Sequence, residues 1–136
     1  MYCNIFYTIN ATTSHSISLW REHQHTIIRG DLNLVLHPKE KRGGVFSHDP
    51  SREQLECIMR DHDLVDIIPR NRSYTWNNRR LGPGNIMERL DHFLVAVSLI
   101  SLLNVATSSI LPCSASDHYP VSLFLGAQLN FGPLPF

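Results

Sequence analysis

Three short stretches of this chain place a carboxylate beside groups that could share in its chemistry. The residues concerned are Asp31 with Asn33, Asp91, and Asp117 with His118. Carboxylate oxygens are ligands that Mg²⁺ accepts, and one or two of them are enough when water and substrate complete the shell. Histidine titrates near neutrality and can therefore transfer protons at physiological pH. These residue types suffice for metal-assisted or acid–base chemistry, provided that the fold brings them together.

The segment around Asp31 is the one around which the other predicted elements are arranged. An apolar run predicts a strand over residues 26–29, and Gly30 allows the chain to turn sharply where it leaves the sheet. The side chains of Asp31 and Asn33 would then project beyond the end of the strand, where sites on open α/β sheets commonly lie. An Asx turn between a strand and a loop uses the same residue types, so both interpretations remain open at this point.

The remaining elements must position these side chains. Apolar residues at helical spacing predict a helix that begins at Pro50 or Ser51. Its inward face would hold Leu55, Ile58 and Met59. The other predicted elements are strands at 5–9, 64–68, 73–76, 86–97 and 121–125, and a helix at 14–25. The turn between residues 76 and 86 is rich in Gly, Pro and Asn, which is typical of a long hairpin.

Residues 93–112 form a charge-free run about long enough to span a bilayer. Serine, threonine and asparagine side chains interrupt this run, and no Lys or Arg closes its far end. We therefore expect a buried strand, a short helix and a second strand here, with no membrane partner. The start of the chain lacks the basic region and apolar run of a signal peptide, which indicates an intracellular protein of the nucleus or cytoplasm.

Length and composition favour one globular domain. The chain has 136 residues and a formal net charge of zero, which argues against disorder and against a basic tail. A local basic cluster could still bind phosphates, and it consists of Arg70, Arg72, Arg79 and Arg80. Three widely spaced cysteines indicate a reducing compartment. Asp61, Asp63 and Asp66 lack the glycine and the terminal glutamate of a calcium loop and are interpreted as solvated surface.

Taken in chain order, several motifs resemble the later part of the endonuclease/exonuclease/phosphatase superfamily. They are Gly-Asp-Leu-Asn at 30–33, Arg-Leu-Asp-His-Phe-Leu at 89–94 and Ser-Asp-His-Tyr-Pro-Val at 116–121. The similarity is closer still to the endonuclease domain of plant non-LTR (LINE-type) retrotransposons. Three further segments fit that pattern, namely Glu-Lys-x-Gly-Gly at 40–44, Tyr-Thr-Trp-Asn-Asn-Arg at 74–79 and Leu-Pro at 111–112. The motifs cover nearly the whole chain.

The resemblance implies a fold and an activity. The fold would be of the α/β (α+β) class, a partial four-layer α/β sandwich of the DNase I-like type. Residues 1–126 would form the C-terminal part of that domain, with the N-terminal sheet strands missing, and residues 127–136 would be a tail. The activity would be phosphodiester hydrolysis with Mg²⁺ or Mn²⁺, acting on DNA. A reverse transcriptase domain would accompany the endonuclease in the parent element.

The resemblance also assigns roles to the carboxylates, to Asn33 and to His118. Asp31 and Asp117 would hold the metal ion. His118 would transfer a proton or stabilise the pentavalent phosphorus, and Asp91 would orient its ring. Asn33 would hold the nucleophilic water or a phosphate oxygen.

Three further residues, Tyr7, Asn10 and Trp76, would lie near the scissile phosphate. Taken singly, most of these assignments have an ordinary structural alternative: Asp91 could pair with Arg89, and a tyrosine or tryptophan on a strand often belongs to the core. The family pattern also includes an early metal-binding glutamate, which has no counterpart ahead of Tyr7. We therefore expect a truncated enzyme of weak or no activity. The alternative is a non-catalytic remnant or interaction fragment of a retroelement.

Overall fold

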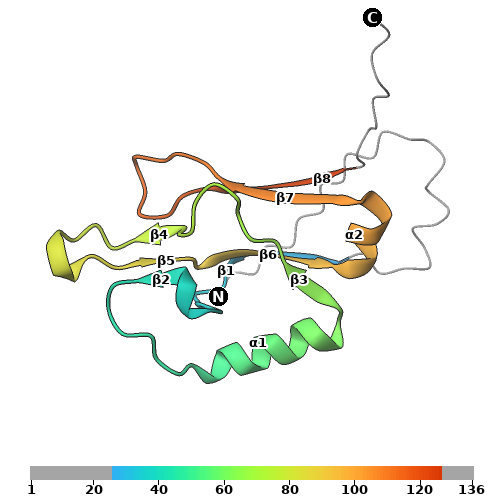
Figure 1. Cartoon of the computed structure of the whole chain (residues 1–136), viewed down its shortest axis with the longest axis horizontal. Helices are drawn as coiled ribbons and strands as arrows, with labels where there is room; N and C mark the ends of the chain where they lie inside the picture. The colour runs from blue at the N-terminus through green and yellow to red at the C-terminus, as the bar shows by residue number, and fades with distance from the viewer. Residues whose placement is uncertain (1–25, 127–136) are drawn as a thin grey trace, which may run out of the picture.

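The structure of the protein, a computed structural model, describes residues 26–126 (Figure 1). Within this range, small antiparallel sheets combine with two α-helices, so the fold is α+β. A three-stranded sheet lies in the middle, with helix α1 on one side and a two-stranded sheet on the other (Figure 1). The predicted α+β class is therefore confirmed for the described residues.

The central sheet has the order β1–β6–β3, with β1 at Ile27–Asp31, β6 at Asp91–Ala96 and β3 at Leu64–Asp66. Strand β6 is the middle strand and pairs antiparallel with both neighbours. Its residues 92–96 are all buried, since the sheet is covered on both faces. A strand buried on both faces needs a nearly continuous apolar sequence, which explains why charges are absent after Asp91.

The charge-free run continues as predicted from strand to helix to strand. Helix α2 spans Val97–Leu103, and strand β7 follows at Val105–Ile110. Asn104 ends the helix in the left-handed conformation, with a φ of 62°, as residues at this position often do. Strand β7 pairs antiparallel with β8 at Val121–Gly126, the predicted closing strand. No helix within residues 26–126 has the length and apolar character needed to cross a membrane.

A second small sheet has the order β2–β5–β4, with β2 at Lys41–Arg42, β5 at Met87–Glu88 and β4 at Trp76–Asn77. Two 3₁₀ turns, η2 at Pro38–Glu40 and η3 at Gly82–Gly84, shape its connections. The predicted hairpin between residues 73–76 and 86–97 is present but much shorter than predicted. Its second arm is divided, because the chain after Glu88 leaves β4 and pairs as β6 with the central sheet.

Helix α1 spans Pro50–Asp61 and begins where the sequence predicts. Asp49 caps it, accepting the Ser51 N–H at 2.9 Å. The buried face is narrower than predicted: Leu55 and Met59 pack against the core, whereas Ile58 is 46% exposed. The prediction for Ile58 is wrong because α1 packs mainly against the short strand β3, which covers only one narrow stripe of the helix.

Several predictions fall on residues that the structure does not describe. These are the strand at 5–9, the helix at 14–25, the tail at 127–136, and the site residues Tyr7 and Asn10. They stay predictions.

Candidate active site

Strand pairing brings two of the predicted carboxylates to one end of the central sheet. The β1–β6 register places Asp31 directly opposite Asp91. Residues directly opposite each other in an antiparallel pair lie on the same face of the sheet with their Cβ atoms close together. Two residues 60 positions apart in the chain thus present their carboxylates to the same space.

Thr75 fixes a third segment against this pair. Thr75 is fully buried, and its Oγ1 accepts the N–H groups of Leu90 and Asp91 at 3.0 and 3.1 Å. Its backbone carbonyl accepts the N–H of Tyr119 at 2.7 Å. One residue therefore holds the start of β6 and the segment before β8 together, and so places His118 beside Asp91. Sequence analysis gave Thr75 no role, because a lone threonine in an aromatic run carries no signal of such bridging.

His118 lies between the two carboxylates. Its Nδ1 is 3.1 Å from Asp91 Oδ2, and its Nε2 is 3.8 Å from Asp31 Oδ2. An ionised carboxylate can only accept a hydrogen bond, so Nδ1 donates to Asp91 and the ring is held in one orientation. The 3.8 Å separation is too long for a direct hydrogen bond and too short for a group to lie in line between the two atoms, so a water would contact both of them from one side. Nε2 is the nitrogen left for proton transfer.

These side chains line one cleft of about 520 Å³. Asp31, Asp91 and His118 contribute to its wall, together with Arg29, Tyr119 and Cys113. Arg29 brings positive charge to the wall beside Asp31, and sequence analysis did not single it out. Since Arg29 precedes Gly30 on β1, its position follows from the same strand that places Asp31.

Asp117 and Trp76 form a pair next to the cleft and do not line it. The indole Nε1–H of Trp76 donates to Asp117 Oδ2 at 3.1 Å, and the Asn77 N–H donates to the Asp117 carbonyl at 3.1 Å. The hydrogen bond from Trp76 lowers the pKa of the exposed Asp117 carboxyl, with a further contribution from the charge of His118. Asp117 is therefore a carboxylate at neutral pH. Its hydrogen bond with Trp76 fixes the segment that carries His118.

Asn33 is joined to Asp31 by a local turn. Its backbone N–H donates to Asp31 Oδ1 at 2.8 Å, and its φ of 51° is left-handed. This is the Asx turn that the sequence left open as an alternative. The exposed Asn33 is not among the residues that line the cleft. Its side-chain role therefore stays a prediction.

The donor chemistry at the cleft suits a hard cation, but the number of protein ligands is small. Asp31 uses Oδ1 for its turn, leaves Oδ2 facing His118, and has a side chain that is 45% exposed. Among residues 26–126, no three His, Cys, Asp or Glu side chains are grouped so that they could hold a metal ion. The oxygen donors fit Mg²⁺ or Mn²⁺ only in the manner in which these ions use one or two carboxylates and several waters.

A buried ionic cluster underlies the site, and sequence analysis missed it. Arg89 has a side chain only 1% exposed, and it forms ion pairs with both Glu40 and Asp66. His92 joins the cluster, with Nδ1 at 3.2 Å from Asp66 Oδ2 and Nε2 at 3.0 Å from the Leu34 carbonyl. The interpretation of Asp66 as solvated surface is wrong, because its side chain is 12% exposed. The alternative pairing of Asp91 with Arg89 does not occur either.

Each charged group in this cluster stabilises the ionised form of its partner. Burial disfavours the ionised form of Asp66, but hydrogen bonds from His92 and Arg89 outweigh it and lower the pKa of the carboxyl. Burial likewise disfavours the Arg89 cation, but the interactions with Asp66 and Glu40 together outweigh it and raise the pKa of the guanidinium. Glu40 also accepts the N–H of Leu36 at 2.9 Å, so the cluster fixes the loop after Asp31 against β6.

Comparison with known proteins adds nothing to this description. No family model, curated protein or solved structure matches this chain.

Proposed function

We propose that this chain carries the histidine–carboxylate part of a metal-dependent phosphodiester hydrolase. The observation that supports the proposal most is the position of His118, with Asp91 on Nδ1 and Asp31 facing Nε2. The ordered motifs that resemble LINE-type endonucleases favour DNA as the substrate and a DNase I-like sandwich as the parent fold. In such an element, a reverse transcriptase domain would be the natural partner.

Three residues of the cleft have separate roles in this proposal. Asp91 accepts the Nδ1–H of His118 and keeps Nε2 directed into the cleft, as the orienting carboxylate of a histidine pair does. Nε2 exchanges a proton with a water or a phosphoryl oxygen bound in the cleft next to it. Arg29 lines the same cleft and offsets the charge of the phosphate.

Asp31 is the carboxylate at the cleft that would hold Mg²⁺ or Mn²⁺, which when bound would stabilise charge on the phosphoryl oxygens. Asp117, to which the resemblance also assigns the metal, is not among the residues that line the cleft. The lining of the cleft includes no glutamate within residues 26–126. With so few protein ligands, we expect the metal to bind weakly and the rate to be low. The resemblance assigns the orientation of the attacking water to Asn33, which is next to Asp31 but is not among the residues that line the cleft.

A supercoiled-plasmid nicking assay tests this proposal. The purified chain is assayed in Mg²⁺ and in Mn²⁺, with EDTA as the chelator control. We expect slow nicking that EDTA abolishes and that His118→Ala reduces at least about 100-fold, the lower end of what a general acid or base contributes. His62→Ala is the matched control, because His62 lies exposed at the end of α1. Nicking that survives in His118→Ala, or none from a folded wild type in either metal, would refute the proposal.

A further inference from the structure

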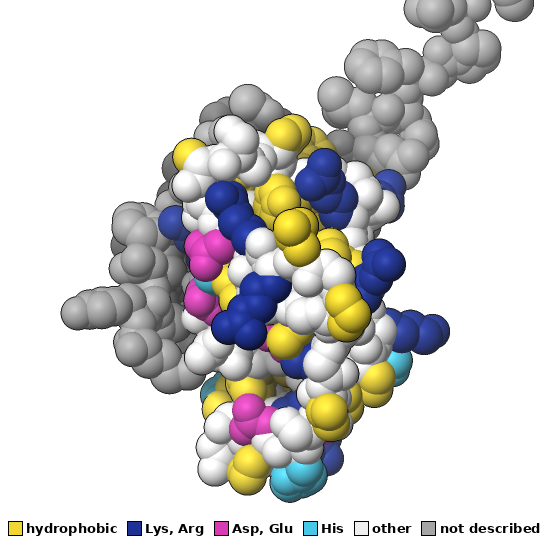
Figure 2. Space-filling view, turned by 90° about the vertical axis from the view of Figure 1, so that its left-hand side faces the viewer, with side chains coloured by type: hydrophobic (Ala, Val, Ile, Leu, Met, Phe, Trp, Pro, Cys, Tyr) yellow, Lys and Arg dark blue, Asp and Glu magenta, His cyan; other side chains and the backbone are white. Residues whose placement is uncertain are grey.

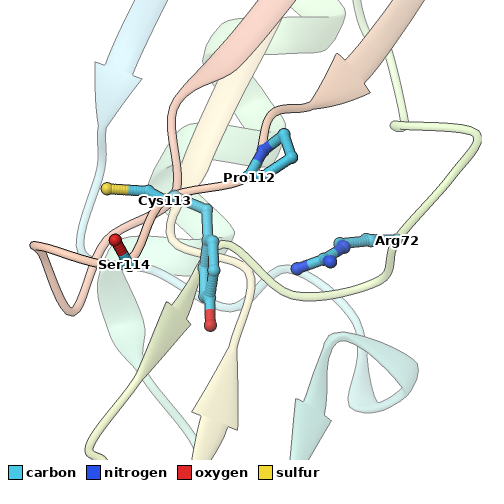
Figure 3. Close-up of a pocket in the computed structure, with 5 residues that line it drawn as sticks. Arg72, Pro112, Cys113 and Ser114 are labelled. Atoms are coloured by element: carbon cyan, nitrogen blue, oxygen red, sulfur yellow. The ribbon is translucent and has the colours of Figure 1, made fainter.

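A second hollow of about 380 Å³ adjoins the cleft. It is lined by Arg72, Pro112, Cys113, Ser114 and Tyr119. Two of these, Cys113 and Tyr119, also line the cleft that holds His118. Figure 3 shows the guanidinium of Arg72 directed into the hollow, with the segment 112–114 along its other side. The two hollows therefore meet at Cys113 and Tyr119.

Arg72 is the source of positive charge in the pocket. Its guanidinium carbon lies 5.4 Å from the centroid of the Tyr119 ring, within the range of a cation–π contact. Within residues 26–126, no carboxylate forms an ion pair with Arg72, so its N–H donors are not committed to an anion. Arg89 differs in this respect, because its guanidinium forms ion pairs with two carboxylates of the buried cluster.

The other residues that line the pocket supply aromatic, apolar and hydroxyl groups. Tyr119 supplies an aromatic face, Pro112 and Cys113 supply apolar surface, and Ser114 supplies a hydroxyl. Arginine binds phosphate through its planar fork of donors, and an aromatic ring accepts the face of any nucleobase. Figure 2, which faces the end of the molecule where the β4–β5 hairpin and the β7–β8 connection lie, shows Lys and Arg side chains interspersed with apolar ones, and some Asp and Glu side chains as well. Such a surface suits a strand of nucleic acid more than a neutral ligand.

We propose that the pocket of Arg72 and Tyr119 is a subsite for the nucleotide next to the scissile phosphodiester, in a single-stranded stretch of DNA. Arg72 contacts the neighbouring phosphate, and Tyr119 stacks on a base. Tyr119 directly follows His118 in the chain, and both residues line the cleft. The subsite deepens the proposed function and rests on it for the identity of the ligand.

The test is a binding measurement that needs no catalysis. Fluorescence anisotropy of a labelled oligodeoxythymidylate is followed in EDTA, between about 50 and 200 mM salt. Arg72→Met is expected to weaken binding and to reduce the slope of log K against log salt by about 0.7, the value for one phosphate contact on a single strand. Arg60→Met removes the same charge from α1, on the opposite side of the central sheet, and should change neither quantity.

Tyr119 is tested by a pair of variants. Tyr119→Leu is expected to weaken binding at least about fivefold, the lower end of the effect of one stacked base, whereas Tyr119→Phe keeps the ring and the affinity. Circular dichroism checks that each variant is folded. If Tyr119→Leu does not fold, the affinities of the two single variants Arg72→Met and Tyr119→Phe are compared with that of the wild type instead. The backbone bond of Tyr119 to Thr75 is independent of the side chain, so folding should persist.

The outcomes separate the subsite from the hydrolase. If Arg72→Met and Arg60→Met weaken binding equally, the subsite is refuted, whatever the nicking assay shows. If plasmid nicking fails but binding still depends on Arg72 and Tyr119, the hydrolase proposal fails and the nucleotide subsite stands. Preferential binding of a labelled polyglutamate peptide in the same pocket, lost in Arg72→Met, would contradict the assignment to nucleic acid.

Discussion

Replacing Arg89 by methionine should remove much of the stability of this protein. The Arg89 side chain is 1% exposed and pairs with two carboxylates, Glu40 and Asp66, each 12% exposed. Methionine keeps most of the length and apolar volume of the side chain but removes the charge and all five donors. Two mostly buried carboxylates would then lose their main counter-ion, and only His92 would remain beside Asp66.

The size of the effect follows from this burial. Removing one partner of a buried ion pair costs about 3–5 kcal/mol, because the other charge is left uncompensated. His92 still donates to Asp66, so we place Arg89→Met near the lower value, about 3 kcal/mol. A domain of this size has a free energy of unfolding of only about 5–15 kcal/mol. With a urea dependence of at most about 3 kcal/mol per molar, the unfolding midpoint should fall by at least about 1 M.

Urea unfolding at neutral pH, followed by circular dichroism, measures this effect. Arg80→Met is the matched control, because Arg80 is exposed on the hairpin and its loss should change the free energy of unfolding by less than about 0.5 kcal/mol. Replacing Glu40 and Asp66 by glutamine and asparagine in the Arg89→Met background should restore part of the stability, since no unpaired charge is then buried. A loss below about 1 kcal/mol in Arg89→Met would show that the cluster is hydrated and the reasoning wrong.

Three further predictions concern single positions. Gly43→Ala should destabilise the protein by about 1–3 kcal/mol in thermal unfolding, since the residue has a φ of 78° and its Cβ would collide with a backbone carbonyl; Gly82→Ala, with a φ of 61° and open space, should cost less. Trp76→Phe should raise the pKa of Asp117, measured by NMR titration, because the indole N–H that favours the carboxylate is lost. Lowering the pH should destabilise the fold through Asp66, whose pKa is lowered in the folded state.

The sign of the acid effect is fixed by the direction of that shift. A carboxyl with a lowered folded pKa contributes stability that is fully present above its unfolded value, near pH 4, and is lost as the pH falls through the folded value. Unfolding free energies measured at neutral pH and at successively lower pH should therefore decrease below about pH 4. In Asp66→Asn that part of the decrease should be smaller, and an unchanged pH profile would contradict the assignment.

The elements that could be predicted from sequence are those that local patterns determine. The charge-free run from Phe93 to Pro112 predicts a buried strand, a short helix and a second strand because polar residues interrupt it at intervals too short for a membrane span. Helix α1 was predictable from its proline and its apolar spacing. Exposure of Ile58 was not, since the width of a buried stripe depends on what the helix packs against.

The contacts that position the site depend on pairings far apart in the chain. Glu40 and Arg89 are 49 residues apart, and Thr75 reaches both β6 and the segment of Tyr119. A single sequence gives no sign of which charges meet, so Asp66 was interpreted as surface. The approach of Asp91 to His118 could be anticipated only through the family resemblance, because spacing alone does not show that two strands bring them together.

The most direct test of the account is whether Asp91 acts through His118. Plasmid nicking is measured for the wild type, Asp91→Asn, His118→Ala and the double variant, all shown to be folded. If Asp91 only orients the ring, Asp91→Asn should slow the wild type strongly and leave the His118→Ala background unchanged. An equal slowing in both backgrounds would contradict the account.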